Sequence, residues 1–292
     1  MPKIDIAIVT DTLDPLSTAT NFILGVSRAI PNITIYTADG SSLGELKSTS
    51  TGWGKLPKIL RTNWFKKRRF AGLDLSRHNI VITTTPLAGF VTLSDKAHHI
   101  HYVTYSDLDI PSDRIRAKTA AGINHYLADC EVTQSALTLS DSSATIMTPP
   151  VITRDYRPAR ERQKYFVAHS SLKPHLGGIG LDIRYIDSSD SQTTSLLASA
   201  WGYVARPDRL DPLILPALAS GALVVAPKLL SDIIQSGESG TLYQDTTDIK
   251  SAVLESAGIA QFPSSLQRKA RRYDQTLFTT KLKKVLIDIY KS

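Results

Sequence analysis

The sequence predicts a two-domain α/β protein in which each domain holds a parallel sheet covered by helices. Short apolar runs alternate with segments of helical spacing over the first 148 residues, and a second alternating series starts after Lys164. Between them lies Thr148-Pro149-Pro150-Val151, a passage too rigid to be helical. The length of 292 residues is sufficient for two domains of about 100–150 residues, each with its own core.

In the first domain, strand-like runs alternate with amphipathic segments. The predicted strands cover residues 4–9, 33–37, 79–84, 100–105 and 126–129. The predicted helices cover residues 21–30, 87–96, 116–126 and 131–139. This alternation is typical of parallel sheets whose two faces are both covered by helices.

In the second domain, the same alternation continues up to one long terminal helix. Strands are predicted at residues 165–169, 182–186, 201–205 and 222–226, and helices at 192–200 and 213–220. Residues 266–290 carry apolar side chains three and four positions apart, which predicts one face of a long helix. The expected boundaries are 1–150 for the first domain, 151–270 for the second, and 271–292 for a helix that returns to the first.

The composition indicates a globular protein of a reducing compartment. The single cysteine, Cys130, cannot form an internal disulfide, and no run approaches the roughly 18 apolar residues that span a bilayer. Asp5 would interrupt the apolar core of a signal peptide at the N-terminus. We therefore expect a cytoplasmic protein.

The net charge of +7 is unevenly distributed. Seven basic residues lie between Lys55 and Arg69, and they end in Lys66, Lys67, Arg68 and Arg69. A second basic stretch covers residues 268–284. The first segment also contains aromatic residues, so it is consistent with a helix packed on the domain, with a peripheral position on the inner face of an anionic membrane, or with a nucleic-acid surface.

Residues 217–243 read as a helix end, a glycine turn, a buried strand and a glycine-closed return strand. This order resembles the donor-side signature of retaining nucleotide-sugar glycosyltransferases of group 1, or family 4, with the GT-B fold. Further similarity lies at Tyr126-Leu127-Ala128-Asp129, at residues 102–107 and at Tyr273-Asp274-Gln275-Thr276. The resemblance implies two Rossmann-like domains whose sheets face a central cleft, with the C-terminal helix crossing back. It also implies a nucleotide-sugar co-substrate and no other cofactor.

The resemblance implies a set of donor-binding residues in the second domain. Lys173 stands where the family clamps the diphosphate, and Arg206 and Arg209 are substitutes for the second basic residue of that clamp. Asp208 is implied as a catalytic residue that binds donor-sugar hydroxyls, and nearby Asp211 could share this role. The alternative interpretation of Asp208 is a helix N-cap. Further members of the expected donor pocket are Asp232, Gly237 and Gly240. Pro216 replaces the glutamate that holds the ribose in the family.

On the acceptor side, Asp107 matches the acidic half of a His-Asp pair and is implied as a second catalytic residue, with Ser106 in place of the histidine. The first loop offers Asp11, Ser17 and Thr18, and the hydroxyls of Ser17 and Thr18 could contact a ligand or cap the following helix. His98, His99 and His101 lack a companion ligand at metal-binding spacing, so no metal site is expected.

Taken together, these features predict a metal-independent, retaining glycosyltransferase that acts on a membrane-associated or polysaccharide acceptor. Two alternatives remain open at this point. The departures at Pro216 and Ser106 are compatible with an inactive GT-B-like binding or scaffold protein. The basic surface is compatible with a DNA-modifying glycosyltransferase. The sequence leaves the oligomeric state undetermined.

Overall fold

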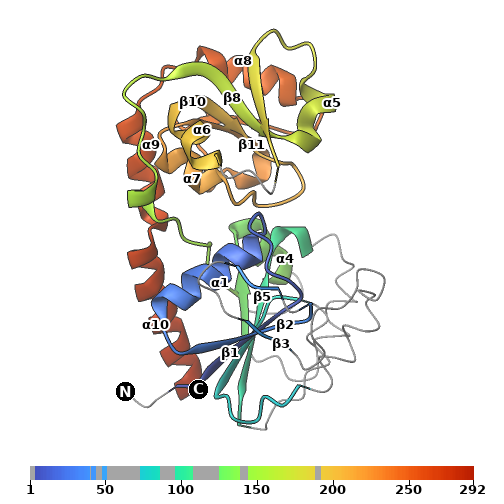
Figure 1. Ribbon diagram of the computed structural model, residues 1–292, viewed down its shortest axis with the longest axis vertical. Coiled ribbons are helices and arrows are strands. Elements are labelled where there is room, and N and C mark those ends of the chain that lie inside the picture. Colours follow the sequence, from blue (N-terminus) through green and yellow to red (C-terminus); the bar gives the residue numbers. More distant parts are fainter. Residues whose placement is uncertain are drawn as a thin grey trace. The chain divides into compact units, whose positions relative to one another are not determined.

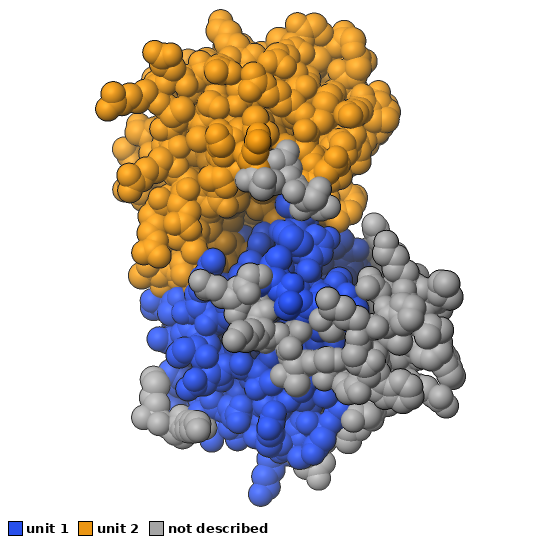
Figure 2. Space-filling model, viewed as in Figure 1, with its two compact units in different colours: residues 1–148, 279–292 blue, residues 149–278 orange. Residues whose placement is uncertain are grey.

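The computed structural model describes residues 4–39, 41–43, 48–50, 73–85, 96–107, 125–138, 144–187 and 192–292. They form two compact units, Met1–Thr148 with Thr279–Ser292 and Pro149–Phe278 (Figures 1 and 2). The predicted helices at 87–96 and 116–126 fall almost wholly outside the described residues, and the basic segment with Lys66, Lys67, Arg68 and Arg69 falls wholly outside them.

The first unit is built on a seven-stranded parallel sheet with the order β3-β2-β1-β4-β5-β6-β7. Its strands are β1 (Ile6–Thr10), β2 (Ile33–Thr37), β3 (Ser48–Ser50), β4 (Ile80–Thr83), β5 (His98–Val103), β6 (His125–Ala128) and β7 (Ala144–Ile146). Its described helices are α1 (Thr18–Ala29), the 3-10 turn η3 (Tyr105–Asp107), α4 (Glu131–Thr138) and, from Thr279 on, α10 (Gln275–Lys291). Every residue of β1 and β4 is buried, which explains why both read as uninterrupted apolar runs.

The second unit has a five-stranded parallel sheet with the order β12-β11-β10-β8-β9. Its strands are β8 (Gln163–His169), β9 (Asp182–Ile186), β10 (Ala200–Val204), β11 (Leu223–Pro227) and β12 (Gly240–Tyr243). Its helices are α5 (Lys173–Leu176), α6 (Thr193–Ser199), α7 (Ile214–Ala219), α8 (Ile249–Gly258) and α9 (Pro263–Ala270). Its 3-10 turns are η4 (Thr153–Asp155), η5 (Ser170–Leu172), η6 (Lys228–Leu230) and η7 (Arg271–Tyr273). The two sheets and their helices confirm the predicted α/β class.

The C-terminal segment differs from the single long helix that its apolar spacing predicts. Helix α9 ends at Ala270, η7 follows, and α10 (Gln275–Lys291) starts after Asp274, whose backbone is extended. At this break Asp274 makes both distant and local contacts. It forms a bridge with Val151 and its Oδ2 accepts from the Thr153 hydroxyl at 2.7 Å, while its Oδ1 accepts from the backbone N–H of Thr276 at 3.0 Å, as a helix N-cap does. The apolar spacing itself is confirmed within α10, where Phe278, Leu282, Leu286 and Ile289 are buried.

Two signature glycines are required by packing. Gly221 has φ +75°, and a Cβ there would lie 2.7 Å from the Cβ of Pro263 and 2.9 Å from a guanidinium nitrogen of Arg162. At Gly240, a Cβ would lie 1.7 Å from the backbone oxygen of Val224 in the neighbouring strand. Both positions therefore need glycine for the fold itself, whatever the site binds.

None of the helices in the described parts of the chain is long and apolar enough to cross a membrane.

Candidate functional site

The carboxyl ends of β8 and β10 bring charged side chains together in the second unit. These strands are neighbours, with Ala168 paired to Val204, so the residues that follow each strand emerge at the same edge of the sheet. His169 ends β8, and the loop of residues 205–213 follows β10. Ligands of parallel α/β sheets bind at this edge, so we take it as the candidate site.

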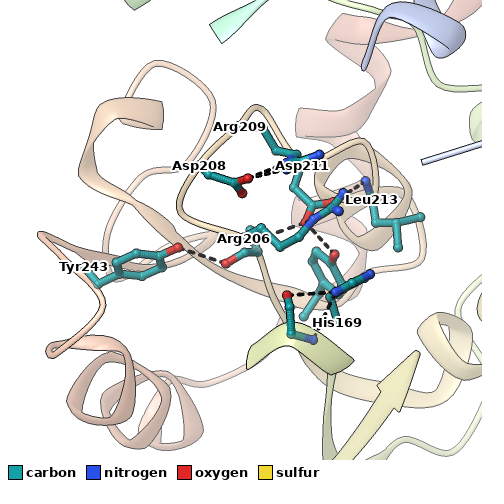
Figure 3. A network of polar contacts seen from close by, with 10 residues as sticks. His169, Arg206, Asp208, Arg209, Asp211, Leu213 and Tyr243 are labelled. Carbon is teal, nitrogen blue, oxygen red and sulfur yellow. Dashed lines mark hydrogen bonds and ion pairs between the residues drawn. The ribbon is translucent and has the colours of Figure 1, made fainter. Parts of the chain in front are cut away.

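A buried carboxylate, Asp211, organises this loop (Figure 3). Its Oδ2 accepts from the Tyr203 hydroxyl at 2.9 Å and from both the backbone N–H and the Nε–H of Arg206 at 3.1 Å. Its Oδ1 accepts from the backbone N–H of Leu213 at 3.1 Å, which is the local bond expected for an aspartate just before a helix. Asp211 is only 1% exposed, so its hydrogen bonds fix the loop.

Arg206 is the cation that this carboxylate holds. The residue is 9% exposed, and its Nε lies 3.1 Å from Asp211 Oδ2 in a mostly buried ion pair. Ala205 is fixed on both sides, because its N–H donates to Val225 at 2.8 Å and its carbonyl accepts from the Tyr243 hydroxyl at 2.9 Å. Burial, followed by the charge of Asp211, raises the pKa of Tyr203 well above its ordinary value. The Tyr203 hydroxyl therefore stays protonated and donates to Asp211. The same carboxylate holds Arg206 in place before any ligand arrives.

A second ion pair lies in the same loop but is open to solvent. The Arg209 guanidinium contacts Asp208, with Nε 3.0 Å from Oδ2, while the two side chains are 35% and 48% exposed. The bond from Arg209 is the main cause of the lowered pKa of Asp208. Asp208 does not cap α7, because Leu213 is the N-cap residue of that helix and its backbone N–H donates to Asp211.

Other predicted donor-side residues have surroundings of their own. The Lys173 ammonium lies 5.2 Å from the ring centroid of Tyr185 on β9. Asp232 is exposed after η6, and Gly237 is an exposed turn residue with φ +79° whose N–H donates to the carbonyl of Gly240 at 2.9 Å. Pro216 is buried in the first turn of α7, where a missing N–H is tolerated.

In the first unit, Asp107 and a carboxylate that sequence reasoning missed, Asp129, follow β5 and β6. Asp107 Oδ2 accepts from the N–H and the hydroxyl of Thr104 at 2.8 and 2.7 Å. Burial raises the pKa of Asp107, and the charge of Asp11 adds to this shift, which places Asp11 and Asp107 within electrostatic range. Asp129 is fully buried, accepts from Thr133 at 2.6 Å, and has its pKa raised to about 6 by burial.

The remaining first-unit candidates have mainly structural surroundings. Ser17 is the N-cap residue of α1 but makes no side-chain capping bond, and Thr18 is buried in the first turn of that helix. His99 Nε2 and His101 Nδ1 lie 3.0 and 2.8 Å from the Thr83 hydroxyl, and burial lowers their pKa values to about 4 and about 3. Within the described residues, no group of three His, Cys, Asp or Glu side chains is placed to hold a metal ion.

Sequence reasoning named Arg206 and Asp211 but not their supports, Tyr203 and Tyr243, nor His169. A signal for Asp211 was present, since Asp211-Pro212-Leu213 just before a helix is typical of an aspartate that bonds the backbone two residues on. For His169 the available signal was its place as the last residue of a predicted strand.

No family model matches the chain, and no curated protein matches it. Among solved structures, sucrose-phosphate synthase from Thermosynechococcus elongatus aligns with a TM-score of 0.77 at 8% identity, over 99% of this chain and all of that one. HepE from Anabaena, in complex with UDP, aligns with a TM-score of 0.69 at 11% identity, over 98% of this chain and all of that one. A trehalose-phosphate synthase from Burkholderia vietnamiensis aligns with a TM-score of 0.61 at 9% identity, over 99% and 100% of the two chains. The chain therefore has the GT-B glycosyltransferase fold.

Proposed function

We propose that the protein is a glycosyltransferase that uses a nucleotide-sugar donor. The observation that carries this proposal is Arg206, a largely buried guanidinium held by Asp211 at the carboxyl edge of the second sheet. The fold shared with sucrose-phosphate synthase and with HepE, which was solved with UDP, supports the same reading.

The proposed chemistry follows from the charge of the leaving group. Breaking the bond between sugar and nucleotide releases a diphosphate, whose developing negative charge needs fixed cations. Arg206 is oriented before the ligand arrives, and Arg209 adds a second, more exposed cation from the same loop. We assign the diphosphate contact to these two residues ahead of Lys173, whose ammonium lies over Tyr185.

The remaining donor and acceptor roles extend the proposal. Asp208, half exposed beside Arg209, accepts hydrogen bonds from donor-sugar hydroxyls, and Asp232 with the backbone near Gly237 shapes the donor pocket. In the first unit, Asp107 faces the acceptor. We further propose that transfer needs no metal, since the arginines supply the positive charge, so the rate should be unchanged by EDTA. We also propose that transfer is retaining, so the product should keep the donor's anomeric configuration.

Titration calorimetry with a panel of nucleotides and nucleotide sugars tests the proposal. UDP and UDP-glucose should bind, and Arg206→Ala should weaken UDP about 10- to 100-fold, as expected for charge-assisted bonds to a phosphate. Arg268→Ala removes an exposed arginine on α9 and is the matched control. Absence of binding at millimolar concentration by the wild-type protein would rule the proposal out.

Turnover separates the enzyme from the alternatives. An inactive binding protein would bind UDP-glucose without releasing UDP, alone or with acceptors. A DNA-modifying enzyme would transfer the sugar to duplex DNA and be retained on it at physiological salt.

For the acceptor, we propose a membrane-associated or polysaccharide substrate. Support comes from the basic segment that ends in Lys66, Lys67, Arg68 and Arg69, and from the exposed lysines of α10, Lys281, Lys283, Lys284 and Lys291. The protein should float with anionic but not neutral liposomes, and replacing residues 66–69 with serine should release it. Unchanged flotation of that variant would remove the role of this segment.

A further inference from the structure

His169 has one ring nitrogen fixed by its own chain. The Nδ1 atom accepts from the backbone N–H of Ser171 at 3.2 Å and lies 2.8 Å from the Ser171 hydroxyl. An Nδ1 atom that accepts an N–H bond carries no proton, so the proton of the neutral ring is on Nε2. No described residue makes a hydrogen bond with Nε2, and the side chain is partly exposed.

The surroundings of His169 favour an anion. Its strand is paired with β10, and the charges within electrostatic range are Arg206 and Arg209, opposed by Asp211 and Asp187. Asp187 is itself engaged by the Ser170 hydroxyl. Partial burial, followed by the charge of Arg206, lowers the pKa of His169, so the ring is neutral at pH 7. It therefore offers one oriented N–H donor without adding to the repulsion between the arginines.

We infer that His169 is a further binding residue for the donor, with its Nε2–H donating to an oxygen of the diphosphate that Arg206 holds. This inference rests on the proposed function. The geometry supplies both requirements, namely a donor of fixed tautomer and a cation from the loop that follows the adjacent strand at the same edge of the sheet. Figure 3 shows His169 together with the labelled residues of the 205–213 loop, Arg206, Asp208, Arg209, Asp211 and Leu213.

Calorimetric titration with UDP and with inorganic pyrophosphate at pH 7.5 tests the inference. His169→Leu should weaken both ligands about tenfold, the size expected for one oriented hydrogen bond to a charged group. His169→Gln, whose amide N–H reaches the position of Nε2, should recover most of the affinity. His175→Leu is the matched control, because it removes a histidine from α5 in the same segment, and it should bind like the wild type.

Nitrogen-15 NMR of the histidine side chains gives a readout that a merely structural role would not move. In the free protein His169 should show the Nε2–H tautomer, and UDP should shift its Nε2 and Hε2 signals. If UDP binds the wild type and Arg206→Ala weakens it, yet His169→Leu binds normally or the proton is on Nδ1, the inference is wrong and the proposed function stands. If the wild type binds neither UDP nor pyrophosphate, both are wrong.

Discussion

Replacing Asp211 by asparagine should lower the free energy of unfolding far more than the same change at its neighbour Asp208. Four donor bonds reach the Asp211 carboxylate, from Tyr203, twice from Arg206, and from Leu213. An asparagine has one acceptor oxygen, so in either orientation its NH₂ group faces a buried donor. At the same time the mostly buried Arg206 loses its counter-charge.

The magnitude follows from burial. A buried donor without an acceptor costs about 1–3 kcal/mol, and breaking a buried ion pair costs about 3–5 kcal/mol. We therefore expect Asp211→Asn to lower the free energy of unfolding by at least about 3 kcal/mol and the midpoint of thermal unfolding by at least about 10 °C. Asp208→Asn breaks a pair whose side chains are 48% and 35% exposed, so less than about 1 kcal/mol should be lost.

Circular dichroism during thermal unfolding measures both variants, and titration with UDP measures whether Arg206 remains oriented. Asp211→Asn should weaken UDP at least about tenfold under conditions where the protein is still folded. Equal thermal midpoints for the two variants would refute the argument that Asp211 organises the loop.

Three further predictions concern packing and protonation. In urea unfolding, Gly240→Ala should destabilise the fold by more than about 3 kcal/mol, because the added Cβ meets a backbone atom. Gly237→Ala has open space around its Cβ and should cost only about 1–2 kcal/mol. The Cys130 thiol is buried and its pKa is raised to about 12, so it should react with iodoacetamide only after unfolding, and rapid labelling of the native protein would contradict this. The folded-state pKa of Asp129 is about 6, above the unfolded value near 3.9, so this group makes stability fall as pH rises from about 4 to 6. Asp129→Asn should abolish this pH-dependent component of the free energy of unfolding, up to about 3 kcal/mol, in urea unfolding at pH 4.5 and 7. An unchanged pH dependence in the variant would contradict the assignment.

The strands were predictable because the pattern of burial is local. Residues 182–186 were predicted as a strand and form β9 with the same bounds, and residues 33–37 likewise form β2. Helix α7 was predicted one residue too long at each end. These elements are recognisable from apolar runs bounded by polar or turn residues, which need no knowledge of distant partners.

The interruption of the C-terminal helix was not predictable in this way. Asp274 leaves helical geometry to bond Thr153, which is 121 positions earlier in the chain. Within residues 266–290 the apolar spacing gives no sign of the break. The local signal is Asp274 itself, whose Oδ1 accepts from the backbone N–H of Thr276 at the start of α10, while its contact with Thr153 depends on the fold.

The candidate site was predictable as a list of charged residues but not as an arrangement. Asp208 and Asp211 lie three positions apart in one polar loop, and the sequence gives both similar roles. The structure separates them, since Tyr203 from β10 reaches Asp211 while Asp208 remains in solvent with Arg209. Which of two neighbouring carboxylates becomes buried depends on the path of the loop, and local sequence does not specify that path.

The packing around Gly221 and Gly240 bears on how related chains should be sorted. Substitution at either glycine disturbs the second sheet or its helices, so selection for a folded protein keeps both even in a chain that has stopped transferring sugar. A search pattern built on these glycines therefore collects active and inactive descendants alike. The ion pair of Arg206 and Asp211 is kept for the same reason, because its loss also destabilises the fold. A pattern that also requires Arg209, whose exposed ion pair contributes less than about 1 kcal/mol to stability, selects on the proposed ligand contact, so divergence at that position is the better marker of lost activity.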